Sequence, residues 1–173
     1  STVAFDWGTG SPAANIQTDD FGAIWTGQIQ PKYTETYTFY LQGDDRSRLY
    51  INGQKLIDYW NSSGPAEAAA TITLQAGQRY DLRLEYFEWL YSASVHLFWS
   101  SPSQAKQLIP ATALYPNATA TSPGGLTGNY YNVFISPDSA LDPVLHAAMG
   151  MGPERLAVQD ASQPDTAIAQ IQQ

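Results

Sequence analysis

The spacing of apolar residues along the chain predicts a series of short β-strands. Between residues 36 and 41 the bulky apolar side chains fall at every second position, so Tyr37, Phe39 and Leu41 should share one face. Similar strand patterns mark four further segments, at 24–29, 71–74, 80–86 and 94–99. Strands at this spacing, with turn residues between them, are typical of an antiparallel β-sandwich, and we therefore expect an all-β fold.

The turn residues between these segments agree with that interpretation. Asn52-Gly53 is a strong hairpin signal because both residues tolerate positive φ. It should join a strand in which Leu49 and Ile51 point inward to a returning strand at 54–58. The breaker-rich composition of 61–65 predicts a loop.

The composition of the chain changes after Pro116. Residues 117–125 are small, polar and rich in strand breakers, which predicts a linker. A further strand is expected at 126–132 and a short helix at 143–149, and the weakly apolar tail from 150 to 173 should be loosely ordered. The predicted organisation is a sandwich over 1–116, a linker over 117–125, and a C-terminal strand with its tail over 126–173.

Charge and composition narrow the classes of function. Sixteen acidic against eight basic residues give a net charge of −8, which argues against nucleic-acid partners and against docking on anionic membranes. The chain has no cysteine, which excludes disulfides, thiol nucleophiles and cysteine-based zinc sites. No apolar run reaches the roughly 18 residues of a membrane-spanning helix, so no membrane insertion is expected. No sequence motif places a nucleophile beside a base, and we expect no catalysis.

The adjacent carboxylates of Asp44 and Asp45 are the most specific chemical feature. They follow the strand at 36–41 and precede the next strand, so rigid elements should hold them from both sides. Paired carboxylates suit a hard cation such as calcium, which prefers oxygen ligands. Aspartates also cap tight turns by hydrogen-bonding to nearby backbone, and that alternative stays open at this stage.

Several ordered motifs resemble the protective-antigen fourteen-kilodalton domain family, the PA-fourteen domain. The matching segments cover roughly residues 3 to 116 and are 5–8, 25–27, 36–39, 44–45, 49–53, 57–58, 76–78, 85–88, 97–99 and 109–110. The resemblance implies a β-sandwich found in bacterial toxins, glycosidases and microbial adhesins. In the adhesin branch it implies sugar binding through a calcium ion held by two aspartates joined by a cis peptide. Other branches are not known as sugar binders, so the family alone leaves function open.

The resemblance also suggests a set of site residues. Asp44 and Asp45 match the family's aspartate pair, and the loop before the last strong strand should supply the other ligands. That loop lacks the amides and glycines of many relatives, so backbone carbonyls of Leu90 and Ser92 are the expected metal ligands. The residues expected to contact the sugar are Trp89, Tyr91, Arg46 and Glu88. For the two rings, core packing or self-association is the competing interpretation.

The family's usual first strand is missing before Ser1, and its pattern occurs instead at residues 125–131. Two explanations are open. Residues 125 onward could begin the next copy in a tandem array. Alternatively, this strand could fold back onto the sandwich, or swap between chains, and so cover an unpaired sheet edge.

Together these features predict a calcium-dependent glycan-binding module of an exported protein, at the cell surface or outside the cell. Its partner would be a glycan or polysaccharide, with strand-swapped self-association as a further possibility. The alternative is a non-catalytic structural or protein-interaction domain within a multidomain extracellular protein or glycosidase.

Overall fold

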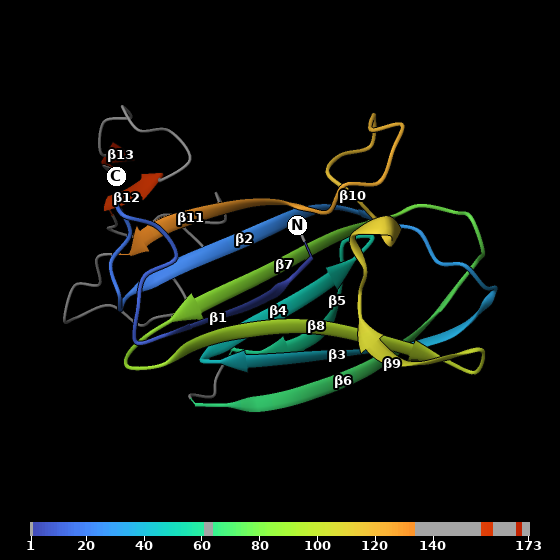
Figure 1. The fold of residues 1–173 in the computed structure, drawn as a ribbon, viewed down its shortest axis with the longest axis horizontal. Coiled ribbons are helices and arrows are strands. Elements are labelled where there is room, and N and C mark those ends of the chain that lie inside the picture. The colour runs from blue at the N-terminus through green and yellow to red at the C-terminus, as the bar shows by residue number, and fades with distance from the viewer. Residues whose placement is uncertain (1, 61–63, 134–156, 161–168, 171–173) are drawn as a thin grey trace.

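Two antiparallel β-sheets make up the fold in the computed structural model, which describes residues 2–60, 64–133, 157–160 and 169–170. The five-stranded sheet consists of β1 (Ala4–Gly8), β8 (Ala93–Ser101), β3 (Glu35–Asp44), β6 (Ala66–Leu74) and β9 (Gln104–Leu108). The eight-stranded sheet consists of β13 (Ala169–Gln170), β12 (Ala157–Asp160), β11 (Thr127–Val133), β2 (Phe21–Ile29), β7 (Tyr80–Glu88), β4 (Arg46–Ile51), β5 (Gln54–Tyr59) and β10 (Leu114–Tyr115). Figure 1 shows the strands running along the long axis of the molecule. The expected all-β sandwich is confirmed.

The core lies between the two sheets and is built by the alternation seen in the sequence. Tyr37, Phe39 and Leu41 of β3 are at most 1% exposed, and Leu49 and Ile51 of β4 are fully buried. Large rings fill much of the remaining volume, because Trp25 and Trp99 are also buried. Many of the aromatic residues are therefore core residues, and their rings cannot contribute to a binding surface.

The hairpin between β4 and β5 turns at Asn52-Gly53 as predicted, with φ of 48° and 74° at the two residues. The Asn52 side chain also accepts a hydrogen bond from the backbone N–H of Asp81 at 2.8 Å. This hydrogen bond joins the β4–β5 turn to the start of β7 and so holds that end of the eight-stranded sheet in place.

Strand β11 lies beside β2 of the same chain, as in the fold-back alternative. The pairing runs from Thr127 opposite Thr26 to Asn132 opposite Phe21. Gly128 approaches Trp25 so closely that a Cβ built at Gly128 would lie 2.7 Å from the indole Nε1. A glycine is therefore required at this position if the strand is to dock in this register.

The segment expected to be a linker, 117–125, folds back against the sheet. The backbone N–H of Gly124 donates to the Leu114 carbonyl at 2.9 Å, and Arg79 donates to the Ala120 carbonyl at 2.7 Å. Beyond Val133 only β12 and β13 are described; the expected helix at 143–149 and most of the expected loose tail lie outside the described residues. Among the described residues, no helix is long and apolar enough to cross a membrane.

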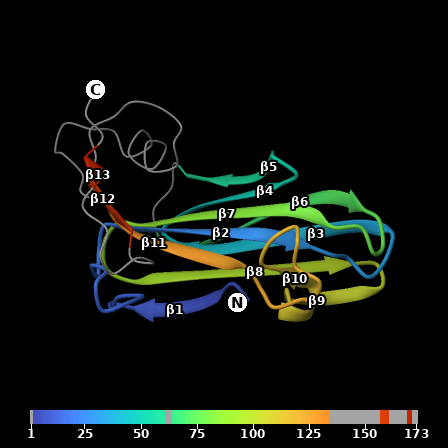
Figure 2. The ribbon, with the colours of Figure 1, turned by 90° about the horizontal axis from the view of Figure 1, so that it is seen from above.

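Figures 1 and 2 show that β12 and β13 lie at one end of the molecule and the segment between β10 and β11 lies toward the other. Two of the chain crossings between the sheets at the end that holds β12 and β13 matter for the site. One runs from β3 into β4, and the other runs from β7 into β8.

Candidate functional site

The two crossings bring the aspartate pair next to the β7–β8 loop, which the sequence analysis predicted to supply the other ligands. Asp44, the last residue of β3, pairs with Ser94 in β8, and Arg46, the first residue of β4, pairs with Phe87 in β7. The β3–β4 junction and the β7–β8 loop, residues 89–92, are therefore neighbours. The peptide bond between Asp44 and Asp45 is cis, as the family resemblance implied.

Asp45 holds the surrounding loops together. It is only 5% exposed, and its two carboxylate oxygens accept hydrogen bonds from the backbone N–H groups of Gly64 at 2.8 Å and Trp89 at 2.9 Å. A carboxylate that accepts backbone N–H groups stabilises a turn, so the capping role expected of an aspartate applies to Asp45. Oδ2 also accepts a longer hydrogen bond from the Leu90 N–H at 3.5 Å, whereas Oδ1 keeps a further lone pair that could face a cation.

Asp44 has a different environment. Its side chain lines the pocket described below, and no hydrogen bond to its carboxylate is seen among the described residues. Partial burial, together with the neighbouring Asp45 charge, raises the pKa of the Asp44 carboxyl. A bound cation would relieve both effects, because it stabilises the charged form of a carboxyl group.

The β7–β8 loop presents the largest exposed apolar side chains that the structure describes in the sandwich. Trp89 is 39% exposed, Leu90 is 42% exposed and Tyr91 is 78% exposed. Tyr91 has a φ of 81°, an unusual value for a residue with a side chain, and its N–H donates to the Asp19 carboxylate at 2.9 Å. The two rings are therefore not core residues, which decides against one of their alternative roles.

A pocket of about 390 Å³ opens between these loops. It is lined by Asp44, Asp45, Gly64, Pro65, Trp89, Leu90, Tyr91 and Ser92. Six of the eight residues selected from the sequence thus meet in one concave site: both aspartates, both expected carbonyl donors and both aromatic rings. A pocket of this size is large enough for a small polar ligand.

Glu88 and Arg46, the other two residues selected, do not line the pocket. Glu88 is fully buried, and its carboxylate accepts a hydrogen bond from the Tyr86 hydroxyl at 2.8 Å. Burial, together with the charges of Asp45 and Asp44, raises the pKa of Glu88 to about 8. The expectation that Glu88 contacts a sugar is wrong for this conformation because no part of it reaches solvent.

Arg46 packs beside the loop, with its guanidinium carbon 5.8 Å from the centre of the Trp89 ring. This cation–π contact orients the indole at the rim of the site. The expected role of Arg46 in sugar binding stays a prediction.

Among the described residues that line the pocket, Asp44 and Asp45 offer carboxylates to a metal, and the backbone oxygens and the Ser92 hydroxyl are neutral donors. Among the described residues, no three Asp, Glu, His or Cys side chains are grouped to hold an ion. The Trp89 carbonyl already accepts the Asp20 N–H at 3.3 Å, which leaves those of Leu90 and Ser92 as the better-placed candidates. The sequence reasoning missed Asp19, Asp20 and Gly64, which hold the loops in place through contacts distant in sequence.

Comparison with known proteins identifies the family and some relatives. A family model described as the PA14 domain matches residues 1–113. The anti-sigma-I factor RsgI3 of Acetivibrio thermocellus is 42% identical over 132 residues, which cover 75% of this chain and 20% of that protein. The chain therefore spans about a fifth of the length of this curated relative.

Solved structures give the same grouping. An anti-sigma factor domain-containing protein from Clostridium clariflavum is 40% identical with a TM-score of 0.64, over 69% of this chain and 40% of that one. A PA14 sugar-binding domain from an RTX adhesin is 16% identical with a TM-score of 0.51, over 62% of this chain and 72% of that one. At that identity the second likeness concerns the fold alone.

Proposed function

The chain belongs to the PA14 domain family, and we propose that it is a non-catalytic, calcium-dependent glycan-binding module of an exported protein. The observation that carries the proposal is the adjacent carboxylate pair Asp44-Asp45 in a pocket rimmed by the exposed rings of Trp89 and Tyr91. Acidic oxygens and exposed aromatic faces together are what a sugar bound through a metal ion requires.

Calcium takes six to eight oxygen ligands, and this pocket offers oxygens of the right kind. The Asp44 and Asp45 carboxylates would supply the charged ligands, and the carbonyls of Leu90 and Ser92 the neutral ones. The described residues offer too few oxygens to complete the shell, so positions would remain for water or for two neighbouring sugar hydroxyls. When bound, calcium supplies the charge that holds those hydroxyls.

The loop side chains would select the sugar. Tyr91, at 78% exposure, and Trp89, at 39%, present ring faces that can pack on the C–H face of a pyranose. Both rings are held by backbone contacts, since the Trp89 N–H donates to Asp45 and the Tyr91 N–H donates to Asp19. A prepositioned ring loses less conformational entropy on binding.

A second candidate function is favoured by one observation. Trp89, Leu90 and Tyr91 form a continuous exposed apolar stretch, and Asp45 already has backbone partners without any metal. The same surface could hold a neighbouring domain in a longer protein, as the partial coverage of the anti-sigma-I factor relative allows. In that case the module would be structural, and calcium would have no effect on binding.

A glycan array probed with the full chain in calcium and again in EDTA tests the proposal. We expect binding in calcium that EDTA removes and that Asp44→Asn abolishes. Asp6→Asn is the matched control, because Asp6 is exposed and pairs with Ser94 on β8 outside the pocket. Binding that is equal in calcium and EDTA, or that survives Asp44→Asn, would contradict the proposal.

A further inference from the structure

A larger groove lies on the opposite end of β7 from the aspartate site. Its volume is about 550 Å³, and its lining includes Tyr50, Asp81, Arg83, Glu85 and residues 116–118. The aspartate site uses the whole β7–β8 loop, which follows the end of β7, whereas this groove uses residues 81–83 and Glu85 of β7 and the β4–β5 turn at Gly53. The two sites share no lining residue.

The floor of the groove is the outer face of the eight-stranded sheet. Thr26, Arg83 and Tyr50 lie in one row across β2, β7 and β4. Their sequence neighbours Trp25, Leu84 and Leu49 are buried in the core, so alternation directs this row away from it. A side-chain row across adjacent strands forms a flat, prearranged surface.

The segment after β10 forms a wall beside this floor, and it is held in place. The Thr127 hydroxyl donates to the Pro116 carbonyl at 3.2 Å, and the Arg79 guanidinium lies 3.6 Å from the centre of the Tyr115 ring. Figure 1 shows this segment, in orange, rising from the sheet at the side away from β12 and β13. The groove is therefore preformed, which lowers the entropic cost of binding.

Arg83 offers hydrogen-bond donors to the groove. Its Nε lies 2.9 Å from Oε1 of Glu85, which is 1% exposed, whereas the Arg83 side chain is 35% exposed. Among the described residues, no hydrogen bond engages the terminal nitrogens of Arg83. Because Glu85 balances the charge of Arg83 and Asp81 adds a further negative charge to the lining, an uncharged ligand fits better than an anionic one.

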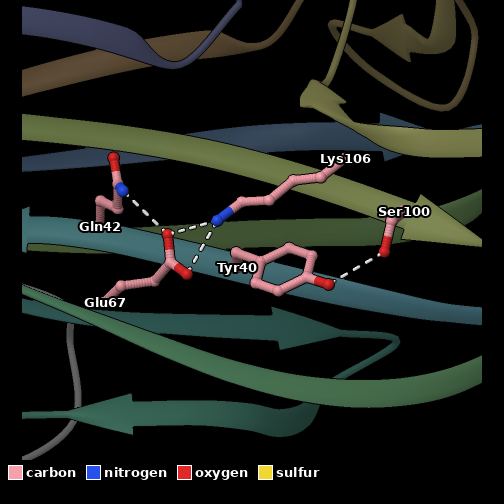
Figure 3. A network of polar contacts seen from close by, with 5 residues as sticks. All are labelled: Tyr40, Gln42, Glu67, Ser100 and Lys106. Carbon is pink, nitrogen blue, oxygen red and sulfur yellow. Dashed lines mark hydrogen bonds and ion pairs between the residues drawn. The ribbon is translucent and has the colours of Figure 1, made fainter.

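Tyr50 differs from the comparable tyrosine on the other sheet. The Tyr40 ring is covered by Lys106, whose Nζ lies 4.2 Å from the ring centre and is held by both Glu67 oxygens at 2.8 and 2.6 Å. Figure 3 shows this arrangement, with the Tyr40 hydroxyl bound to Ser100. Tyr40 is therefore closed to a ligand, whereas Tyr50 lines an open groove.

We propose that the groove over β2, β7 and β4 is a second carbohydrate-binding site, independent of calcium, for a stretch of neutral polysaccharide. Tyr50 supplies a ring surface for a sugar, and the Arg83 guanidinium and the polar groups of Thr26 and Asn117 bind its hydroxyls. The proposal does not depend on the aspartate site.

Affinity gel electrophoresis of the full chain in EDTA tests it, because EDTA silences any calcium-dependent binding. The polysaccharides are arabinoxylan, barley β-glucan, xyloglucan and galactan, with polygalacturonate as the anionic comparison. We expect at least one neutral polysaccharide to retard the chain more strongly than polygalacturonate does. Retardation by none of the four, or strongest retardation by polygalacturonate, would overturn the proposal.

Variants locate the binding. Tyr50→Ala should weaken it about tenfold, as expected for the loss of one aromatic contact. Tyr40→Ala, on the opposite sheet, is the matched control and should leave it unchanged. Ala118→Trp fills the groove from its exposed rim, where folding is not at risk, and should also weaken binding. Binding that both Tyr50→Ala and Ala118→Trp leave intact would overturn the assignment to this groove.

Discussion

Separate replacement of Asp45 and Asp44 by alanine should give unequal losses of stability without metal. Asp45→Ala removes the acceptor of two short hydrogen bonds, from the N–H groups of Gly64 at 2.8 Å and Trp89 at 2.9 Å. A hydrogen bond to a charged group contributes about 1.5–3 kcal/mol, so the two bonds sum to about 3–6 kcal/mol. Removing a buried charge next to Asp44 offsets part of this, and we expect a net loss of roughly 2–4 kcal/mol.

Asp44→Ala should behave differently because the Asp44 carboxylate lines the pocket and its pKa is raised by burial and by Asp45. The metal-free fold stabilises the charged form of Asp44 very little, so its replacement should change the free energy of unfolding by less than about 0.5 kcal/mol. Urea unfolding in EDTA, followed by tryptophan fluorescence, measures both variants.

The difference in stability between the two variants distinguishes Asp45, which stabilises the fold, from Asp44, which is available to bind a ligand. If the two variants unfold at the same urea concentration in EDTA, the assigned roles are wrong. If Asp44→Ala is the less stable of the two, Asp44 has a structural role that its contacts do not show.

Three further predictions concern the fold and the loop. The pKa of Glu88 is about 8 in the folded protein, against an ordinary value of 4.5. As the pH rises, Glu88 therefore loses its proton in the unfolded chain before it does so in the folded protein. The free energy of unfolding should fall between these two pH values, by up to about 1.4 kcal/mol per pH unit. Glu88→Gln should flatten this dependence in denaturant unfolding from pH 5 to pH 9, and parallel curves would exclude Glu88 as its source. Gly128→Ala should lower the melting temperature, at a cost of about 1–3 kcal/mol, because its Cβ would lie 2.7 Å from Trp25; an unchanged melting temperature would mean that β11 does not dock in this register. Tyr91→Gly should change the free energy of unfolding by less than about 1 kcal/mol, since φ there is 81°, yet weaken any calcium-dependent glycan binding; undiminished binding would remove Tyr91 from the site.

Local signals in the sequence predicted most of the sandwich. The alternation in β3 and the Asn52-Gly53 turn act over a few residues, and both occur in the structure as predicted. The adjacent aspartates could be located because they directly follow a strongly patterned strand. The first strand, β1 at Ala4–Gly8, was not predicted, although Phe5 and Trp7 alternate with Ala4 and Asp6 in its sequence.

The burial of Glu88 follows from the alternation of inward-facing residues along β7. Leu82, Leu84 and Tyr86 point into the core, and the same alternation continues to Glu88 at the end of β7. A charged residue at such a position resembles a ligand donor in sequence but lies inside the protein. The strand period, and not the residue type, decided its placement.

Contacts between distant segments could not be derived from the sequence. The Asp45 carboxylate accepts hydrogen bonds from the backbone N–H groups of Gly64 and Trp89. The Arg79 side chain donates a hydrogen bond to the carbonyl of Ala120, which lies in a segment whose composition predicts a linker. Such contacts depend on how the sheets stack, which period and composition do not encode.

The most direct test of the central claim is calorimetric titration of calcium into the metal-stripped chain, with thermal melting alongside. A calcium site between Asp44, Asp45 and the β7–β8 loop predicts saturable binding, and stabilisation of about 2.7 kcal/mol at a hundredfold excess over the dissociation constant. Both effects should be lost in Asp44→Asn and retained in Asp6→Asn. Absence of binding to the wild-type chain, or undiminished binding to Asp44→Asn, would contradict the claim.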